Sequence, residues 1–374
     1  MIFVLLFVVV CFLAYSNGAN DNFKGVATLF GSGTTNYSRA INWATLTTFL
    51  GSVTAIFLAS SLVKNFSSKG LVPDALIQTP EFAVSIALGA GITVFLATKI
   101  GMPISTTHSL VGGLFGSGIM AVGRAFNFSL LGSTFIMPLI LSPLMATVAS
   151  MVAYLLFRRL RVFFGVNKQM CICIGQEYVP IVNNLNKVNP VADSITSYKS
   201  INIDKEQNCI ERYQGAFLGL NAQKLLDVAH FLSAGVVSFA RGLNDTPKLV
   251  GLLIVINSLS IEWGMVALAF AMAIGGLLNA KKVGETVSKK ITPMNHGQGF
   301  TANLITGLLV TTASIHGLPV STTHVSVGSI FGIGSVTKKS DIKVIRNIVL
   351  SWILTLPIAA LISAIVFSLL SYVF

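Results

Sequence analysis

An eight-residue segment that occurs twice constrains this chain more than any other feature. Residues 101–108 and residues 317–324 both read Gly, an apolar residue, Pro, another apolar residue, then Ser-Thr-Thr-His. Hydroxyl residues that follow a proline and open an apolar run are typical of a helix N-terminus. Such a terminus presents free backbone N–H groups and the positive end of the helix dipole, which suits an anion. Two copies in one chain predict a single anion held between two related halves.

The composition is that of a membrane protein. Of the 374 residues, 53% are hydrophobic and 10% are charged, whereas a soluble domain carries roughly 25% charged residues. On so apolar a chain, the formal charge of +12 marks the cytoplasmic ends of membrane spans rather than a nucleic-acid surface. We therefore expect a multi-pass protein of the cell membrane (plasma or inner membrane) that is surrounded by lipid and binds no nucleic acid.

Matched motifs divide the chain into two repeats. Asn20 and Asn244 lie 224 residues apart, and His108 and His324 lie 216 apart, so the spacing drifts slowly, as in a duplication. We predict a first transmembrane repeat at residues 1–157, a polar central cytoplasmic loop at 158–224 and a second transmembrane repeat at 225–374.

The number of crossings predicts how the repeats are oriented. Each half contains about five crossings, and an odd number places the halves in opposite orientations. The sequence therefore predicts an all-α polytopic membrane protein of two inverted-topology repeats, with broken helices or re-entrant hairpins and about 10–12 membrane segments. Basic residues at 158–161, 281–290 and 338–346 then lie in the cytoplasm, while Lys64 and Lys69 lie outside.

A polar break interrupts an apolar segment at matched positions in both halves. Each break contains an Asn-Asp pair, namely Asn20 and Asp21, and Asn244 and Asp245. A carboxylate inside a membrane is costly, so it indicates function by default. Oxygen ligands of this kind suit Na⁺, and the carboxylate is also able to relay a proton. The structural alternative is a salt bridge from each Asp to Lys24 or Lys248, three residues on. Both roles hold if the lysines balance the aspartates until substrate arrives.

The repeated segment supplies hydroxyl groups to a candidate substrate site. A tetrahedral oxyanion needs several convergent donors, and hydroxyls with helix-end N–H groups supply them without fixed charge. The alternative is that these residues cap helices and pack closely. We favour binding because the spacing is identical in both copies, which comprise Ser105, Thr106, Thr107, Ser321, Thr322 and Thr323. For His108 and His324 we favour a buried, backbone-bonded role over a proton relay.

The four cysteines give no metal-ligand spacing. They are Cys11, Cys171, Cys173 and Cys209, and the Cys171-Ile172-Cys173 stretch falls in the central loop. A redox pair is one interpretation of that stretch, and incidental thiols are the one that we favour.

These motifs together resemble the inorganic phosphate transporter (PiT) family. The resemblance rests on Gly-Ala-Asn-Asp at 18–21, Gly-Leu-Asn-Asp at 242–245, the two Pro-x-Ser-Thr-Thr-His segments and the stretch at 283–291, and it covers nearly the whole chain. It implies transport of orthophosphate with a coupling cation, ion sites at the Asn-Asp pairs, and phosphate held by the Ser-Thr-Thr sets. The chain departs from the family at Phe23-Lys24-Gly25, where many members have small residues.

The leading hypothesis is therefore a phosphate symporter with Na⁺ as the coupling ion and H⁺ as its alternative. We count Lys24 and Lys248 among the substrate-binding residues. No cofactor other than the coupling ion is expected, and a homodimer is left open. A sulfate symporter of the same family is the nearest rival, and a passive anion channel is another. An intramembrane serine hydrolase using Ser105 or Ser321 is disfavoured, because two equal copies do not make one asymmetric catalytic triad.

Overall fold

The computed structural model describes residues 1–181, 194–256 and 258–373. These residues form two compact units. Met1–Tyr154 and His230–Phe374 make up the membrane unit, and Leu155–Ala229 make up the central domain.

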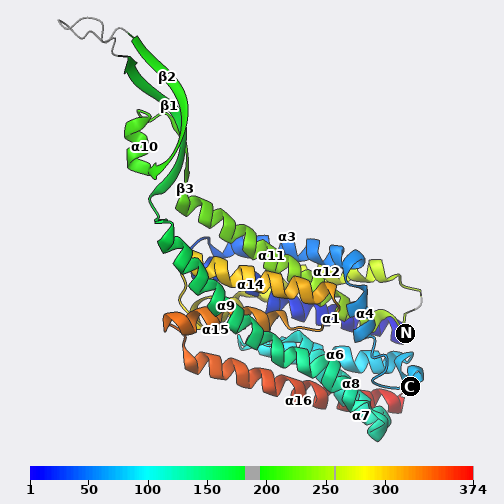
Figure 1. Cartoon of the computed structure of the whole chain (residues 1–374). Helices are drawn as coiled ribbons and strands as arrows, with labels where there is room; N and C mark the ends of the chain where they lie inside the picture. Colours follow the sequence, from blue (N-terminus) through cyan, green and yellow to red (C-terminus); the bar gives the residue numbers. More distant parts are fainter. Residues whose placement is uncertain (182–193, 257, 374) are drawn as a thin grey trace, which may run out of the picture. The chain divides into compact units, whose positions relative to one another are not determined.

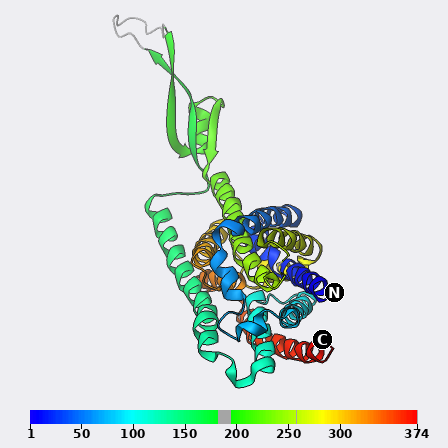
Figure 2. The ribbon, with the colours of Figure 1, turned by 90° about the vertical axis from the view of Figure 1, so that its right-hand side faces the viewer.

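The membrane unit is built from helices (Figures 1 and 2). Large apolar side chains such as Leu361 and Leu369 are exposed on its outside, as expected of a surface that faces lipid. The predicted multi-pass helical architecture is confirmed. Six stretches in the described part of the chain are long and apolar enough to cross a bilayer: Ile2–Gly31, Tyr37–Leu58, Pro80–Lys99, Phe128–Phe163, Ile261–Asn279 and Ile342–Val373.

The first half opens with a broken helix. The α-helix stops after Asp21 and tightens into a 3₁₀ turn, as the polar break predicts. The elements in order are α1 (Ile2–Asp21), η1 (Asn22–Val26), α2 (Ala27–Gly31), α3 (Tyr37–Leu58), α4 (Ser60–Phe66), α5 (Asp74–Ile77), α6 (Pro80–Lys99), α7 (Thr106–Val122), η2 (Gly123–Ala125), α8 (Phe128–Leu130), η3 (Leu131–Ile136) and α9 (Met137–Phe163).

The second half has fewer elements than the first half and differs from it at its first helix. That helix runs without a break to Val250, although Pro247 lies inside it, so the break expected before residue 249 is wrong. The elements are α11 (Ala222–Val250), η4 (Gly251–Leu253), α12 (Ile261–Asn279), α13 (Lys281–Glu285), η5 (Thr286–Lys290), α14 (His296–Ile315), α15 (Thr322–Thr337) and α16 (Ile342–Val373).

The two Ser-Thr-Thr-His segments begin helices, as predicted. Gly101 and Gly317 have φ angles of +75° and +71°, a left-handed conformation that favours glycine and turns the chain before each helix. The helices α7 and α15 then start at Thr106 and Thr322. Both lie inside the membrane unit and are shorter than the spans around them.

Glycines bring helices of opposite halves into backbone contact. A Cβ atom on Gly116 of α7 would lie 2.0 Å from the carbonyl oxygen of Ala360 in α16, and one on Gly332 of α15 would lie 2.3 Å from that of Thr147 in α9. Gly116 and Gly332 are 216 residues apart, the same offset that separates the two histidines. The last helix of each half therefore packs against the Ser-Thr-Thr-His helix of the other half.

The two helices that carry the Asn-Asp pairs are held in the same crossed way. A Cβ atom on Gly18 of α1 would lie 2.0 Å from the carbonyl oxygen of Met272 in α12, and one on Gly242 of α11 would lie 2.1 Å from that of Thr48 in α3. These glycines are 224 residues apart, the offset of the Asn-Asp pairs. Both carboxylate-bearing segments are thus fixed by helices of the opposite half.

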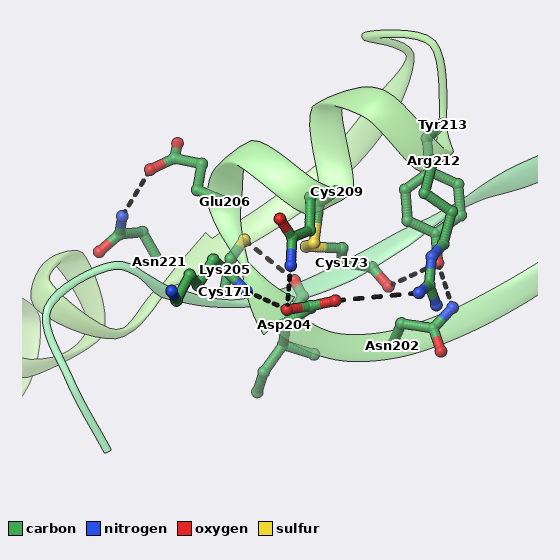
Figure 3. The surroundings of a disulfide bond; sticks show 12 residues. Cys171, Cys173, Asn202, Asp204, Lys205, Glu206, Cys209, Arg212, Tyr213 and Asn221 are labelled. Carbon is green, nitrogen blue, oxygen red and sulfur yellow. Dashed lines mark hydrogen bonds and ion pairs between the residues drawn. A yellow bond between two sulfur atoms is a disulfide. The ribbon is translucent and has the colours of Figure 1, made fainter. Parts of the chain in front are cut away.

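The central domain contains a sheet that the sequence analysis did not anticipate. Its strands β1 (Met170–Ile181), β2 (Ser194–Lys205) and β3 (Phe217–Asn221) are antiparallel in the order β2-β1-β3, with α10 (Glu206–Arg212) packed against them. A disulfide joins Cys173 to Cys209 (Figure 3), so the expectation of incidental thiols is wrong for these two. The segment is therefore more than a polar loop, and the all-α expectation holds for the membrane unit.

Candidate functional site

The two helix tips lie against one another at the centre of the membrane unit. We call residues 105–107 at the start of α7 the first tip, and residues 321–323 at the start of α15 the second tip. The Thr107 hydroxyl is 3.5 Å from the carbonyl oxygen of Val320, and the Thr323 hydroxyl donates to that of Ile104 at 3.0 Å. All six hydroxyl residues are buried. The structure thus brings the repeated segments together.

Serine and threonine have different surroundings at the tips. The Ser105 and Ser321 hydroxyls cap their helices by accepting from the backbone N–H groups of His108 and His324 at 3.1 and 3.2 Å. This is the structural role weighed from the sequence, and it occupies both oxygens. Thr107 and Thr323 instead contact the opposite half, whereas Thr106 donates to Asp21 of its own half at 3.1 Å.

Each lysine bridges the two halves beside one carboxylate. The Lys24 ammonium group donates to Asn20 Oδ1 at 2.8 Å, Asp21 Oδ1 at 2.5 Å, the Ile104 carbonyl at 2.8 Å and Thr323 Oγ1 at 2.7 Å. Four oxygen atoms from three elements therefore surround one positive charge. Three of them belong to the first half and the fourth belongs to the second.

Lys248 belongs to the second half and makes the corresponding contacts with the tip of the first half. Its ammonium group donates to Thr107 Oγ1 at 2.8 Å, the Val320 carbonyl at 2.7 Å and Asp245 Oδ1 at 3.5 Å. The predicted Asp-Lys pairs are thus present in both halves, and each also contacts the tip of the other half.

Arg241 and Asn17 join the two Asp-Lys pairs in one buried polar cluster, and sequence reasoning missed both residues. Arg241 donates to Asn17 Oδ1 at 2.5 Å, and its Nε lies 3.6 Å from Asp245 Oδ2. The Asn17 amide donates to Thr106 Oγ1 at 3.0 Å and lies 3.2 and 3.3 Å from oxygens of Asp21 and Asp245. Residues 17 and 241 are separated by 224 positions, so the repeat offset would have paired them.

The cluster carries one more positive than negative charge. Among the described residues in contact here, three are cationic (Lys24, Arg241 and Lys248) and two are anionic (Asp21 and Asp245), which leaves +1. All five side chains are at most 4% exposed. A buried charge without a partner is unfavourable, so the arrangement favours an anion beside the tips.

The asparagines of the Asn-Asp pairs hold the polar segments in place. Asn20 donates to Thr98 Oγ1 at 2.9 Å and to the Met102 carbonyl at 3.0 Å. Asn244 donates to the Val320 carbonyl at 3.1 Å and accepts from Ser314 Oγ at 3.2 Å. These amides fix the chain just before each tip, and only the Asn20 oxygen also contacts a lysine among the described contacts.

The two histidines directly follow the tips in the sequence, and their side chains are not part of the charged cluster. Their rings are 4.5 Å apart between centroids, and His324 Nδ1 is 3.1 Å from the Leu139 carbonyl oxygen. His324 thus has the backbone contact that was favoured from the sequence. An apolar cavity of about 460 Å³ borders both rings and is lined by residues of α9, α15 and α16.

Two helix tips that meet buried Asn-Asp pairs inside a membrane unit are the arrangement of a membrane transporter. A family model described as the phosphate transporter family matches residues 17–363. The chain belongs to this family, whose members are transporters and not enzymes. The hydrolase alternative is thereby set aside, in agreement with the capping role of both serines.

Related proteins and a solved structure match this chain over nearly its full length. A protein of Pyrococcus abyssi named "Putative phosphate permease" is 28% identical, with 96% of this chain and 95% of that protein covered. A protein of the same name from Haemophilus influenzae is also 28% identical, over 97% of this chain and 95% of its own length. A solved structure titled "The sodium-dependent phosphate transporter" has the same fold, with a TM-score of 0.76, 23% identity and both chains fully covered.

Proposed function

We propose that this chain is a secondary active symporter that carries inorganic phosphate across the cell membrane together with Na⁺. The net positive charge of the buried cluster beside the two helix tips carries the proposal. Phosphate at the tips would balance that charge and accept hydrogen bonds from Thr107, Thr323 and the helix-end N–H groups. The names of the relatives support phosphate as the anion.

The lysines supply a physical basis for coupling. The four oxygens around Lys24 Nζ are of the kind that bind Na⁺, so the ammonium group stands where a cation would stand. Na⁺ enters this shell only after the lysine leaves it, and the lysine leaves only when a second negative charge competes for it. Phosphate at the tips is that charge.

This exchange makes the binding of the two ions interdependent. Once phosphate attracts the ammonium groups of Lys24 and Lys248, the Asp21 and Asp245 oxygens are open to Na⁺. By linkage, Na⁺ then strengthens phosphate binding by the same factor as phosphate strengthens Na⁺ binding. The proton alternative uses the same carboxylates, which would take up H⁺ in place of Na⁺ when the lysines move.

Proteoliposomes test the function and the coupling ion together. Uptake of labelled phosphate is measured with an inward Na⁺ gradient, with choline in place of Na⁺ at the same pH, and with an inward H⁺ gradient alone. We expect accumulation against the phosphate gradient only with Na⁺. Uptake that is unchanged in choline and driven by H⁺ would reject Na⁺, and no uptake with either gradient would reject symport.

Sulfate is the rival substrate because it is also tetrahedral. A site for hydrogen phosphate must accept a hydrogen bond from the protonated oxygen of its ligand, whereas sulfate has no such proton to donate. Asp21 contacts Thr106 of the first tip directly, and Asp245 is linked to Thr107 through Lys248, so both carboxylates are candidate acceptors. A hundredfold excess of unlabelled sulfate is therefore expected to leave labelled phosphate uptake nearly unchanged. Strong competition by sulfate, with saturable uptake of labelled sulfate, would favour the rival.

A further inference from the structure

Three cysteine sulfur atoms converge in the central domain (Figure 3). Cys171 and Cys173 are two positions apart on β1, so their side chains share one face of the strand, and Cys209 meets them from α10. The three sulfur atoms lie within 4.8 Å of one another. All three residues are at most 2% exposed. The cluster is therefore a built feature of the domain interior, outside the transport site.

The disulfide uses only two of these sulfurs. Cys173 and Cys209 are joined, while Cys171 has a free thiol packed beside them. Among the described residues, this thiol makes one weak hydrogen bond, to the Ile172 carbonyl at 3.7 Å. A disulfide that only stabilises the domain needs no third buried sulfur atom beside it. The disulfide alone therefore does not account for the position of Cys171.

Nearby carboxylates are engaged elsewhere. Asp204 accepts from Asn208 at 2.7 Å and pairs with Arg212 at 3.8 Å, and Glu206 accepts from Asn221 at 2.8 Å. Tyr213 and Phe217 form the apolar side of the cluster. The convergent donors are thus three soft sulfur atoms, a set that selects thiophilic metals over Mg²⁺ or Ca²⁺.

The expected compartment favours thiols over a disulfide. Arg158, Arg159 and Arg161 lie at the start of the domain, before β1, and clustered arginines mark the cytoplasmic end of a span. Cytoplasmic cysteines are kept reduced, and grouped ones there more often bind metal than form structural disulfides.

We propose that Cys171, Cys173 and Cys209, with the disulfide reduced, bind one Zn²⁺ ion as three thiolates. A cellular dithiol transfers two electrons and two protons to the Cys173–Cys209 bond, which breaks to give two thiols on the protein, and the dithiol becomes a disulfide. Zn²⁺ then displaces one proton from each of the three thiols. Zinc–sulfur bonds of about 2.3 Å place tetrahedral ligands about 3.8 Å apart. The three sulfur atoms lie within 4.8 Å of one another, and those of Cys173 and Cys209 move apart to this separation once their bond is reduced. An external ligand such as water takes the fourth position.

The test uses the full-length transporter purified in detergent under reducing conditions. Metal that copurifies is measured by mass spectrometry, and Cd²⁺ titration is followed by the thiolate-to-metal charge-transfer absorbance. We expect about one ion per chain and a charge-transfer band typical of sulfur ligands. Cys171→Ser is expected to weaken Cd²⁺ binding at least tenfold, and Cys11→Ser, which alters a cysteine of α1, is expected to leave it unchanged.

Two results would overturn the proposal. One is a reduced protein that binds no Zn²⁺ or Cd²⁺. The other is a Cys171→Ser variant that binds as tightly as the parent chain. Cys171→Ser retains both cysteines of the disulfide, so it is able to keep the fold when oxidised, and circular dichroism checks this. Intact phosphate uptake by the same variant separates failure of the metal site from failure of the transport function.

Discussion

At the scale of single residues, a buried lysine stands beside each aspartate. Lys24 contacts Asp21 and the second tip, and Lys248 contacts Asp245 and the first tip. Removing one partner of a buried ion pair costs about 3–5 kcal/mol. The two sides of each pair therefore give different mutant phenotypes.

Replacing either aspartate by asparagine is expected to abolish coupled uptake. Asp21→Asn and Asp245→Asn remove the charged ligand of one cation site, and a loss of about 3 kcal/mol weakens apparent Na⁺ affinity roughly a hundredfold. Uptake in proteoliposomes and membrane insertion are measured together. The exposed Asp74→Asn is the matched control. Normal Na⁺-driven uptake by either variant would make that carboxylate structural.

Replacing Lys24 by methionine is expected to uncouple Na⁺ binding from phosphate. The change keeps the length of the side chain but leaves the Asp21 shell without its internal cation. Na⁺ should then raise the melting temperature of the variant in the absence of phosphate, because a ligand that binds only the folded state stabilises it. The parent chain and the control Lys338→Met should show no such rise. A variant that ignores Na⁺ would contradict the exchange mechanism.

Much of the cluster could be predicted from residue types and spacing, because the repeat displays it twice. The structure brings Asp21, Asp245, both lysines and the two tips together, although their roles in binding remain predictions. Arg241 escaped notice because a basic residue beside a polar break reads as an ordinary flanking charge. Its matched position holds a neutral Asn17, so the duplication did not repeat the charge. The capping role of Ser105 and Ser321 depends on hydrogen bonds that spacing alone leaves open.

At the scale of elements, glycines decide which helices meet. Gly116→Ala and Gly332→Ala should each destabilise the protein by about 1–3 kcal/mol, because the added methyl group overlaps a carbonyl oxygen of α16 or α9. Thermal unfolding in detergent, followed by size-exclusion chromatography, measures the shift. Gly132→Ala is the control, since nothing lies within 4 Å of its added Cβ. Equal melting temperatures for all three variants would mean that the helices adjust without cost.

Element boundaries were predicted well where caps define them and poorly elsewhere. The helices α7 and α15 begin at Thr106 and Thr322, directly after the capping residues Ser105 and Ser321. In α11 the polar run 241–248 suggested a break, but Pro247 is accommodated and the helix continues to Val250. The central sheet was missed because β1 and β2 interleave polar and apolar residues in a segment whose charge is typical of a loop.

At the scale of the whole molecule, the expected orientation of the membrane unit is open to test. The basic connection that contains Lys338 is expected in the cytoplasm, and the loop that contains Lys69 is expected outside. Within the membrane unit, α4 lies near the chain termini and α16 begins at the opposite end (Figure 1). In a cysteine-free background that retains uptake, an impermeant maleimide should label Lys69→Cys in intact cells.

Lys338→Cys should be labelled only after the membrane is permeabilised. Both positions are exposed, so access and not burial decides the result. The reverse pattern would invert the predicted topology and would place the central domain outside the cell.

The contacts that Lys24 and Lys248 make with the opposite half also bear on the last step of the proposed transport cycle. In the symport cycle proposed above, the protein must return to its starting conformation after it releases phosphate and Na⁺. The Lys24–Asp21 and Lys248–Asp245 pairs would keep each carboxylate neutralised during that step. Return without bound substrate is a step that a phosphate–phosphate exchanger would not need.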